Sequence, residues 1–151
     1  MLIDTDVFKE SAEFHGVKGI VRVGDKIIVM RRDMNAPHLP LYIDLPGGGR
    51  EGGESPFEAF HREIMEMLHL PIEESNIVYA KRYENNHDRT DDTFFLVTEI
   101  LNIDEKIIIL GEKGLMYYTM TMHDFLEHPE GIEKQKLRII HYLEDVKETF
   151  T

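Results

Sequence analysis

The apolar and polar residues along the chain follow a pattern that predicts strands on either side of a helix. Residues 15–23 are rich in β-branched side chains, Gly24 marks a turn, and residues 26–32 contain a second apolar run. Two such runs joined by a short glycine turn predict an antiparallel hairpin. A loop with two prolines follows, and residues 41–45 then predict a short strand that leads into a run of glycines.

A helix is predicted over residues 55–68. Ser55 is suited to cap this helix, Pro56 to occupy its first position, and Glu58 to complete a capping box. At about 100° per residue the apolar side chains share one face, which we expect to pack on the core. They are Phe57, Phe60, Ile64 and Leu68.

The rest of the chain predicts further strands and a second helix. Within residues 131–150 the spacing of the apolar residues is that of an amphipathic helix. The order of elements predicts a layered α/β domain, and no repeat or linker divides residues 1–151 into two domains. The apolar positions of the second helix are Ile139, Tyr142, Leu143, Val146 and Phe150, and the further strands are expected at residues 77–83, 93–101, 106–110 and 115–120.

The composition is that of a soluble globular protein, with 42% hydrophobic and 9% aromatic residues in 151. No apolar run approaches the roughly 18 residues that span a bilayer, and the N-terminus lacks the pattern of a signal peptide. Without cysteine the chain has no disulfide, no thiolate metal site and no cysteine nucleophile. We therefore expect a cytoplasmic protein with no membrane partner.

The formal charge of −12 narrows the class of partner. It argues against a nucleic acid polymer, because phosphate backbones are held chiefly by lysine and arginine. A small phosphate ester stays compatible with the charge, because a bound Mg²⁺ can neutralise the ester locally. Outside the glycine-rich segment and the helix that follows it, a solvated acidic surface explains the charge.

Two carboxylates at one edge of the first predicted helix suggest a metal site. Glu63 and Glu66 are neighbours at i and i+3, and like charges so placed repel each other unless a cation lies between them. Mg²⁺ takes hard oxygen ligands from one or two carboxylates, from water and from substrate phosphates. The preceding glycines allow the backbone to approach such an ion or a phosphate. A solvated acidic helix face is the alternative interpretation.

The segment that carries these residues resembles the Nudix box. That motif is a glycine, five residues, a glutamate, seven residues, and then Arg-Glu-apolar-any-Glu-Glu-any-Gly-apolar. Residues 45–48 also read Leu-Pro-Gly-Gly, a lead-in common in the family. Two positions depart from the motif, since Met67 replaces the second glutamate of the pair and His69 replaces the glycine. The positions that match in register are Gly48, Glu54, Arg62, Glu63, Ile64, Glu66 and Leu70.

The resemblance implies an α/β/α sandwich around a mixed β-sheet, formed by one Nudix-like domain. It also implies hydrolysis of the diphosphate linkage of a small nucleoside diphosphate derivative or nucleotide, dependent on Mg²⁺ or Mn²⁺. Metal ions would activate water and neutralise the charge that develops at phosphorus. The expected partner is a small phosphorylated substrate, with no nucleic acid polymer and no membrane, and a homodimer is compatible with this picture.

The resemblance also assigns roles by position in the motif. Glu63 and Glu66 would be metal ligands, together with the carbonyl oxygen of Gly47. Arg62 would pair with a carboxylate and orient it, and Glu54 would support the geometry between the loop and the helix.

Further candidates lie beside or beyond the box. Gly48 would let a substrate phosphate approach the backbone, and Arg32, at the end of a strand that faces the box, is a candidate contact for that phosphate. Many family members place the general base in a variable loop outside the box, which makes Glu112 the candidate base here; an exposed turn glutamate is the alternative. The candidate catalytic residues are therefore Arg62, Glu63, Glu66 and Glu112.

Met67 bears on whether the chain is an enzyme. Its thioether is soft and uncharged, and is a poor ligand for Mg²⁺, although on the helical wheel it can simply extend the core face. Two hypotheses follow: a hydrolase with an altered metal site, and a Nudix-fold nucleotide-binding or regulatory module with reduced or lost catalysis. Alternative sources of the missing ligand are Glu58, Asp88, Asp91, Asp92 and substrate phosphates.

Overall fold

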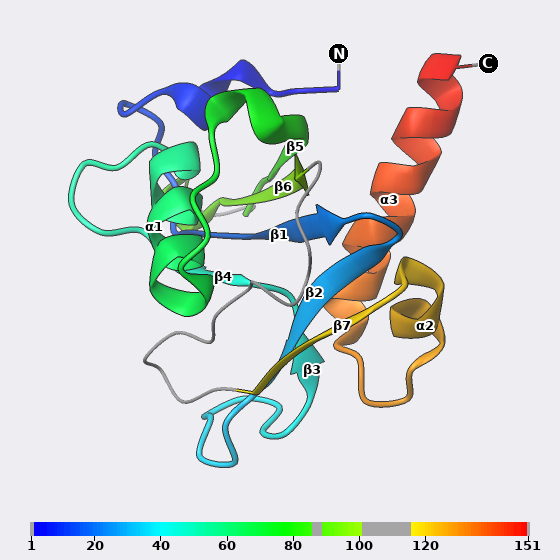
Figure 1. Ribbon diagram of the computed structural model, residues 1–151. Helices are drawn as coiled ribbons and strands as arrows, with labels where there is room; N and C mark the ends of the chain where they lie inside the picture. The colour runs from blue at the N-terminus through cyan, green and yellow to red at the C-terminus, as the bar shows by residue number, and fades with distance from the viewer. Residues whose placement is uncertain (1, 86–88, 101–115, 151) are drawn as a thin grey trace.

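A mixed β-sheet forms the centre of the computed structural model, which describes residues 2–85, 89–100 and 116–150 (Figure 1). Its strands are β1 (Gly16–Val23), β2 (Lys26–Arg31), β3 (Ile43–Asp44), β4 (Gly47–Gly49), β5 (Ile77–Tyr83), β6 (Thr93–Ile100) and β7 (Met116–Met120). The main path has the order β3-β2-β1-β6-β5, while β4 pairs with β1 and β7 pairs with β2. β1 and β6 are parallel, and the other pairs of these strands are antiparallel.

Helices cover both faces of the sheet. α1 (Pro56–Leu68) lies on one face, and α2 (Met122–Glu127) and α3 (Glu133–Phe150) lie on the other (Figure 1). A short 3-10 helix at Thr5–Phe8 packs beside α1. This arrangement confirms the α/β/α sandwich around a mixed sheet. Within the described ranges no helix is long and apolar enough to cross a membrane.

Two apolar layers separate the helices from the sheet. Successive strand residues point to opposite faces, so Phe94 of β6 packs in the layer under α1 and Phe95 packs in the layer under α3. Phe60 of α1 and Ile139 of α3 are fully buried in these two layers. The sheet is therefore buried on both faces, which fixes how each helix is rotated about its axis.

Most of the predicted elements are confirmed. The hairpin closes with Val23 opposite Lys26. α1 begins after Ser55, whose hydroxyl accepts a hydrogen bond from the Glu58 N–H while the Glu58 carboxylate accepts one from the Ser55 N–H. β5, β6 and β7 lie where strands were expected, and the strand expected at residues 41–45 comprises only Ile43–Asp44.

Other features were missed or wrong. β4 lies in the glycine run, where no apolar alternation could signal a strand, and α2 has only six residues. Leu143 was one of the apolar positions predicted for this helix but is 42% exposed, whereas Ile139 and Tyr142 are buried in the layer beneath α3. The strand predicted over residues 106–110 lies outside the described residues.

Candidate functional site

α1 carries the charged residues of the motif along the edge that faces β4. Burial of Phe60 and Ile64 fixes the rotation of the helix and so decides which side chains reach this edge. The Glu63 side chain is 7% exposed and the Glu66 side chain is 43% exposed. The two carboxylates therefore differ in environment, one lying in the protein and the other at its surface.

Arg62 is the centre of a network of ion pairs. Its Nε donates to Glu54 Oε2 at 2.8 Å, and its Nη2 donates to Glu54 Oε1 at 3.1 Å. Its Nη1 donates to Glu63 Oε1 at 3.0 Å and lies 3.6 Å from Glu66 Oε2. Nη2 also donates to the carbonyl oxygen of Gly49 at 2.8 Å. One guanidinium therefore ties the loop, β4 and both candidate metal ligands of α1 together.

The backbone of β4 lies directly against Glu63. A Cβ atom at Gly48 would lie 2.4 Å from Glu63 Oε1, so only glycine leaves room for the carboxylate where it stands. Gly47 has a φ of 145°, and a Cβ atom there would lie 2.1 Å from the carbonyl oxygen of Val17. These two close approaches explain the need for glycine at both positions.

The ionisation of the site follows from these contacts. The hydrogen bonds from Arg62 hold the pKa of Glu54 below its usual value, and the same contacts raise the pKa of Arg62. Burial, with the nearby charge of Glu63, raises the pKa of Tyr117 to about 12. Among the described residues the Tyr117 hydroxyl has no hydrogen-bond partner. At neutral pH the edge therefore combines a fixed ion-pair network with a protonated phenol.

The oxygen donors at this edge fit a particular kind of metal binding. Within the described part of the chain, no group of three or more His, Cys, Asp or Glu side chains is placed to hold a metal ion. Mg²⁺ is usually held by one or two carboxylates together with water and substrate phosphates. The residues present therefore fit an ion that binds together with a diphosphate, and Glu63, Glu66 and the Gly47 carbonyl would hold it from the protein side.

The two departures from the motif have local structural explanations. Met67 is 3% exposed and packs in the apolar layer beneath α1, so it extends the core face of the helix. His69 ends the helix in the left-handed conformation, with φ 53° and ψ 33°, and its N–H donates to the Met65 carbonyl. Glycine is favoured in this capping position because it has no Cβ atom to strain.

The alternative acidic residues are engaged elsewhere or lie apart. The Glu58 carboxylate completes the capping box, and Asp92 is fully buried and accepts a hydrogen bond from Arg82 at 2.9 Å. Asp91 lies in a short 3-10 helix before β6, and Asp88 is outside the described residues. None of the three that the structure describes joins the carboxylates of α1 in a group that could hold a metal ion.

Arg32 is not brought to the box, and the position of Glu112 is not described. Arg32 donates through Nη1 to Asp44 Oδ2 at 3.1 Å, and Lys18 Nζ donates to the same oxygen at 2.9 Å. Arg32 therefore pairs with a buried carboxylate of β3 and not with a residue of the box. Glu112 lies outside the described residues, so its role as a general base stays a prediction.

A cleft of about 240 Å³ opens beside β4 and was not foreseen from the sequence. Gly48 and Gly49 line it, so it is continuous with the backbone that lies against Glu63. α3 contributes Lys134, Gln135 and Arg138. The signal that could have revealed this cleft is the pair of cations at i and i+4, Lys134 and Arg138, on a helix whose neighbouring face meets the core.

A larger hollow of about 580 Å³ lies along β5 and the N-terminal segment. It contains no residue of the box, so its volume alone does not mark the functional site. The smaller cleft beside β4 reaches the network through Gly49, whose carbonyl oxygen accepts a hydrogen bond from Arg62. A further hollow of about 350 Å³ is lined by Glu54 and Arg62 themselves.

Comparison with known proteins places this geometry in a family. The family model described as NUDIX domain matches residues 14–143. No curated protein matches the chain. Among solved structures, the MutT protein from Methanosarcina mazei Go1 superposes with a TM-score of 0.67 at 17% identity, over 91% of this chain and 98% of that one.

Two further structures show the same fold. A structure from a study of MutT from Aliivibrio salmonicida and Vibrio cholerae has a TM-score of 0.56 at 18% identity, over 84% of this chain and 95% of that one. A bifunctional NMN adenylyltransferase/ADP ribose pyrophosphatase from Francisella tularensis, complexed with AMP and Mn ion, has a TM-score of 0.62 at 16% identity. That match covers 88% of this chain and 41% of the other. At these identities the likeness shows the fold alone.

Proposed function

The chain belongs to the Nudix family, and we propose on that basis that it hydrolyses the diphosphate linkage of a small nucleoside diphosphate derivative with Mg²⁺ or Mn²⁺. Members of the family are pyrophosphohydrolases that act on small nucleotide derivatives and generally use divalent metal ions. The Francisella tularensis protein, with its stated pyrophosphatase activity and bound AMP and manganese, is an example on the same fold.

The observation that carries this proposal is the geometry around Arg62. Its Nη1 forms ion pairs with both Glu63 and Glu66, and its Nε donates to Glu54 Oε2 at 2.8 Å. Glu63 lies against Gly48 with no side chain between the carboxylate and the backbone. A helix that only packs on a sheet does not need two carboxylates fixed by one arginine. A site for a cation and a diphosphate does need carboxylate oxygens held in place beside backbone that a ligand can approach.

Each residue would contribute a definite part to the hydrolysis. In the reaction a water oxygen forms a bond to phosphorus, the bridging P–O bond breaks, and a proton is released. A bound divalent ion would activate the water and neutralise charge on the diphosphate. Arg62 would fix the positions of Glu63 and Glu66, the β4 backbone would admit the diphosphate, and Glu112 would accept the proton.

A Nudix-fold module that binds its ligand without efficient turnover is the second candidate. Met67 favours it, because this residue is buried in the apolar layer beneath α1 and its thioether is a poor ligand for Mg²⁺. Both candidates predict binding of a nucleoside diphosphate derivative, and only the first predicts metal-dependent turnover.

Turnover on a ligand panel separates the two candidates. Nucleotide sugars, dinucleotides and nucleoside triphosphates would be incubated with Mg²⁺ or Mn²⁺, with release of phosphorylated products as the measurement. We expect turnover by the wild type that falls at least 100-fold in Glu63→Gln, the size of effect expected for a group that positions a metal. Glu144→Gln, an exposed glutamate of α3, is the matched control and should keep full activity.

The remaining outcomes have definite meanings. Metal-dependent turnover that survives in Glu63→Gln would remove Glu63 from the mechanism. Ligand binding without turnover by the wild type, with either metal, would establish the binding module instead.

A further inference from the structure

Arg138 of α3 is a buried cation that forms no ion pair with any carboxylate of the described residues. It is 4% exposed, and its Nη2 donates to the Thr93 hydroxyl at 2.8 Å. Its guanidinium also lies 4.4 Å from the centre of the Tyr83 ring. Within the described residues these neutral groups are its contacts, and no carboxylate forms an ion pair with it. Buried charges are normally paired, so this arrangement calls for an explanation.

Asp44, the buried carboxylate whose charge acts on Arg138, is already paired with other cations. Asp44 is 1% exposed, and its Oδ2 accepts hydrogen bonds from both Lys18 and Arg32. Its charge favours the ionised form of Arg138 only from a distance, while burial lowers the pKa of that guanidinium. Lys18 and Arg32 therefore already neutralise Asp44, and Arg138 forms no ion pair with this carboxylate.

Lys134 and Gln135, two neighbours of Arg138 on α3, line the cleft beside β4 together with it. Lys134 lies one turn before Arg138, and burial together with the charge of Arg138 lowers its pKa. Among the described residues Lys134 also lacks a carboxylate partner. Gln135 is 5% exposed, and its side-chain oxygen is buried without a hydrogen-bond partner. The wall thus offers two cations to an anion, and beside them an amide oxygen that can only accept a hydrogen bond.

We propose that the wall formed by Lys134, Gln135 and Arg138 binds, through its two cations, an anionic group on the substrate, a carboxylate or a phosphate monoester, at a distance from the hydrolysed linkage. This inference rests on the proposed function and names a substrate class within it. The preferred substrate is then a nucleoside diphosphate derivative with an acidic substituent, not one whose second moiety is neutral.

The cleft adjoins β4, the strand that lies against the carboxylate of Glu63 on α1. Gly48 lines the cleft and also lies against Glu63, so one ligand could extend from the carboxylates of α1 to the cations of α3. A guanidinium matches a carboxylate or a phosphate with paired hydrogen bonds, and Thr93 adds a hydroxyl beside it. An acidic substituent bound there would pair with the guanidinium of Arg138, and both charges would be shielded from water in the cleft.

Matched pairs of ligands test the proposal. UDP-glucuronate and UDP-glucose differ by one carboxylate, and NADP⁺ and NAD⁺ differ by one phosphate monoester. Dissociation constants with Mg²⁺ would be measured by titration calorimetry, and product release would be followed separately. In at least one pair we expect the wild type to bind the acidic member at least tenfold more tightly, and the pair that responds identifies which anion is taken.

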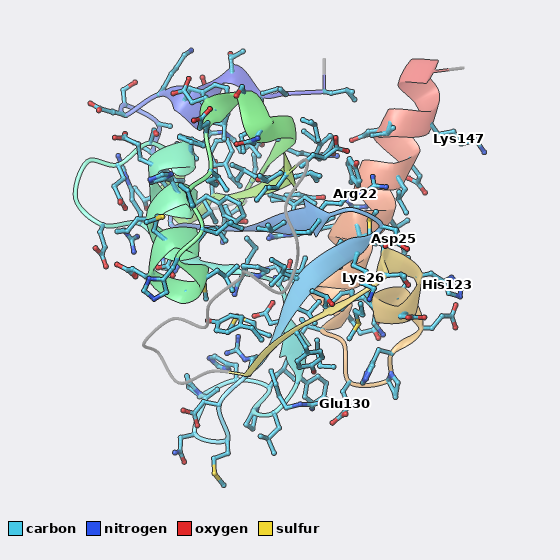
Figure 2. All side chains as sticks on the ribbon, in the orientation of Figure 1. Arg22, Asp25, Lys26, His123, Glu130 and Lys147 are labelled. Atoms are coloured by element: carbon cyan, nitrogen blue, oxygen red, sulfur yellow. The ribbon has the colours of Figure 1, made fainter. Side chains whose placement is uncertain are left out.

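Variants of α3 show whether the wall produces this preference. Arg138→Met should reduce the preference to less than about twofold, and Lys134→Ala should reduce it about threefold. Lys134 is exposed at the helix surface, so its variant keeps the proposal testable if Arg138→Met fails to fold. Lys147→Ala is the control, because Lys147 is an exposed cation of the same helix that points away from the sheet (Figure 2).

The outcomes separate this inference from the proposed function. Equal affinity for both members of both pairs, failure of all four ligands to bind, or a preference that survives in both cleft variants would overturn the anion site. Equal rates of hydrolysis for neutral and acidic members, with no difference in affinity, would support the proposed hydrolase and contradict the anion site. An acidic preference with no turnover would support the anion site and remove the hydrolase.

Discussion

The edge of α1 and the wall of α3 are both charged, but their charges are paired in opposite ways. At the edge, Glu54 and Glu63 each accept a hydrogen bond from Arg62. At the wall, Arg138 contacts a hydroxyl and an aromatic ring, and within the described residues it meets no carboxylate. Ion pairs fix the positions of the side chains that form them. A buried cation that no described carboxylate pairs with lowers the stability of the fold and stays available to an anionic ligand. We therefore expect the two regions to respond differently to the same substitution.

Replacing each arginine with methionine is the strongest test of this contrast. Arg62→Met removes the cation from among several carboxylates and should lower the free energy of unfolding by about 3–5 kcal/mol. Arg138→Met removes a buried charge that no described carboxylate pairs with, and its free energy of unfolding should stay within about 1 kcal/mol of the wild type. Urea denaturation of the three proteins measures both changes, and equal losses in the two variants would abolish the contrast.

Substitution of Met67 changes the number of carboxylates at the edge of α1. Met67→Glu restores the motif but places a carboxylate in the core beside Glu63, so without metal it should lose roughly 2–3 kcal/mol of stability. Met67→Leu keeps an apolar side chain of similar volume and should lose less than about 1.5 kcal/mol.

Added Mn²⁺ shows whether the introduced carboxylate reaches a metal. It should raise the melting temperature of Met67→Glu more than that of Met67→Leu, because the ion binds only the folded site. If Mn²⁺ raises both melting temperatures equally, position 67 does not face the metal site.

Glu54→Gln tests the pairing of the acidic edge through its pH dependence. The pKa of Glu54 is lowered in the folded protein by Arg62, so its contribution is complete above the ordinary glutamate pKa of about 4.3 and is lost as pH falls through the lowered value. The variant should lose about 2 kcal/mol at pH 7, and this difference should shrink towards zero in strong acid. Denaturant titrations from pH 7 to pH 3 measure it; a loss independent of pH would mean that the carboxylate charge is not responsible.

The acidic edge could largely be predicted from the sequence, whereas the basic wall could not. Ser55, Pro56 and the apolar spacing of α1 are local signals, and they placed Glu63 and Glu66 at one edge of the helix. The contact of Glu54 with Arg62 spans only eight residues and belongs to the same short motif.

The wall of α3 depends on contacts between distant parts of the chain. Arg138 meets Thr93, 45 positions away, and the cleft also needs Gly48 from β4. Polar residues on a helix are ordinarily interpreted as its solvated face, and a strand made of glycine gives no apolar signal. Pattern analysis therefore found the side of the site that one segment encodes, and missed the side that the tertiary fold assembles.

His69 offers the smallest effect and the cleanest separation of stability from function. It is exposed and holds a left-handed conformation that strains any residue with a Cβ atom, so His69→Gly should raise the free energy of unfolding by about 0.5–1 kcal/mol. His69→Ala keeps the Cβ atom and should not stabilise, which distinguishes relief of backbone strain from loss of the imidazole. Because the substitution changes the end of α1 without touching Arg62 or the cleft, ligand affinity should stay unchanged. A stabilised protein with altered affinity would mean that the helix end and the charged network move together, and that the departure at His69 belongs to the site.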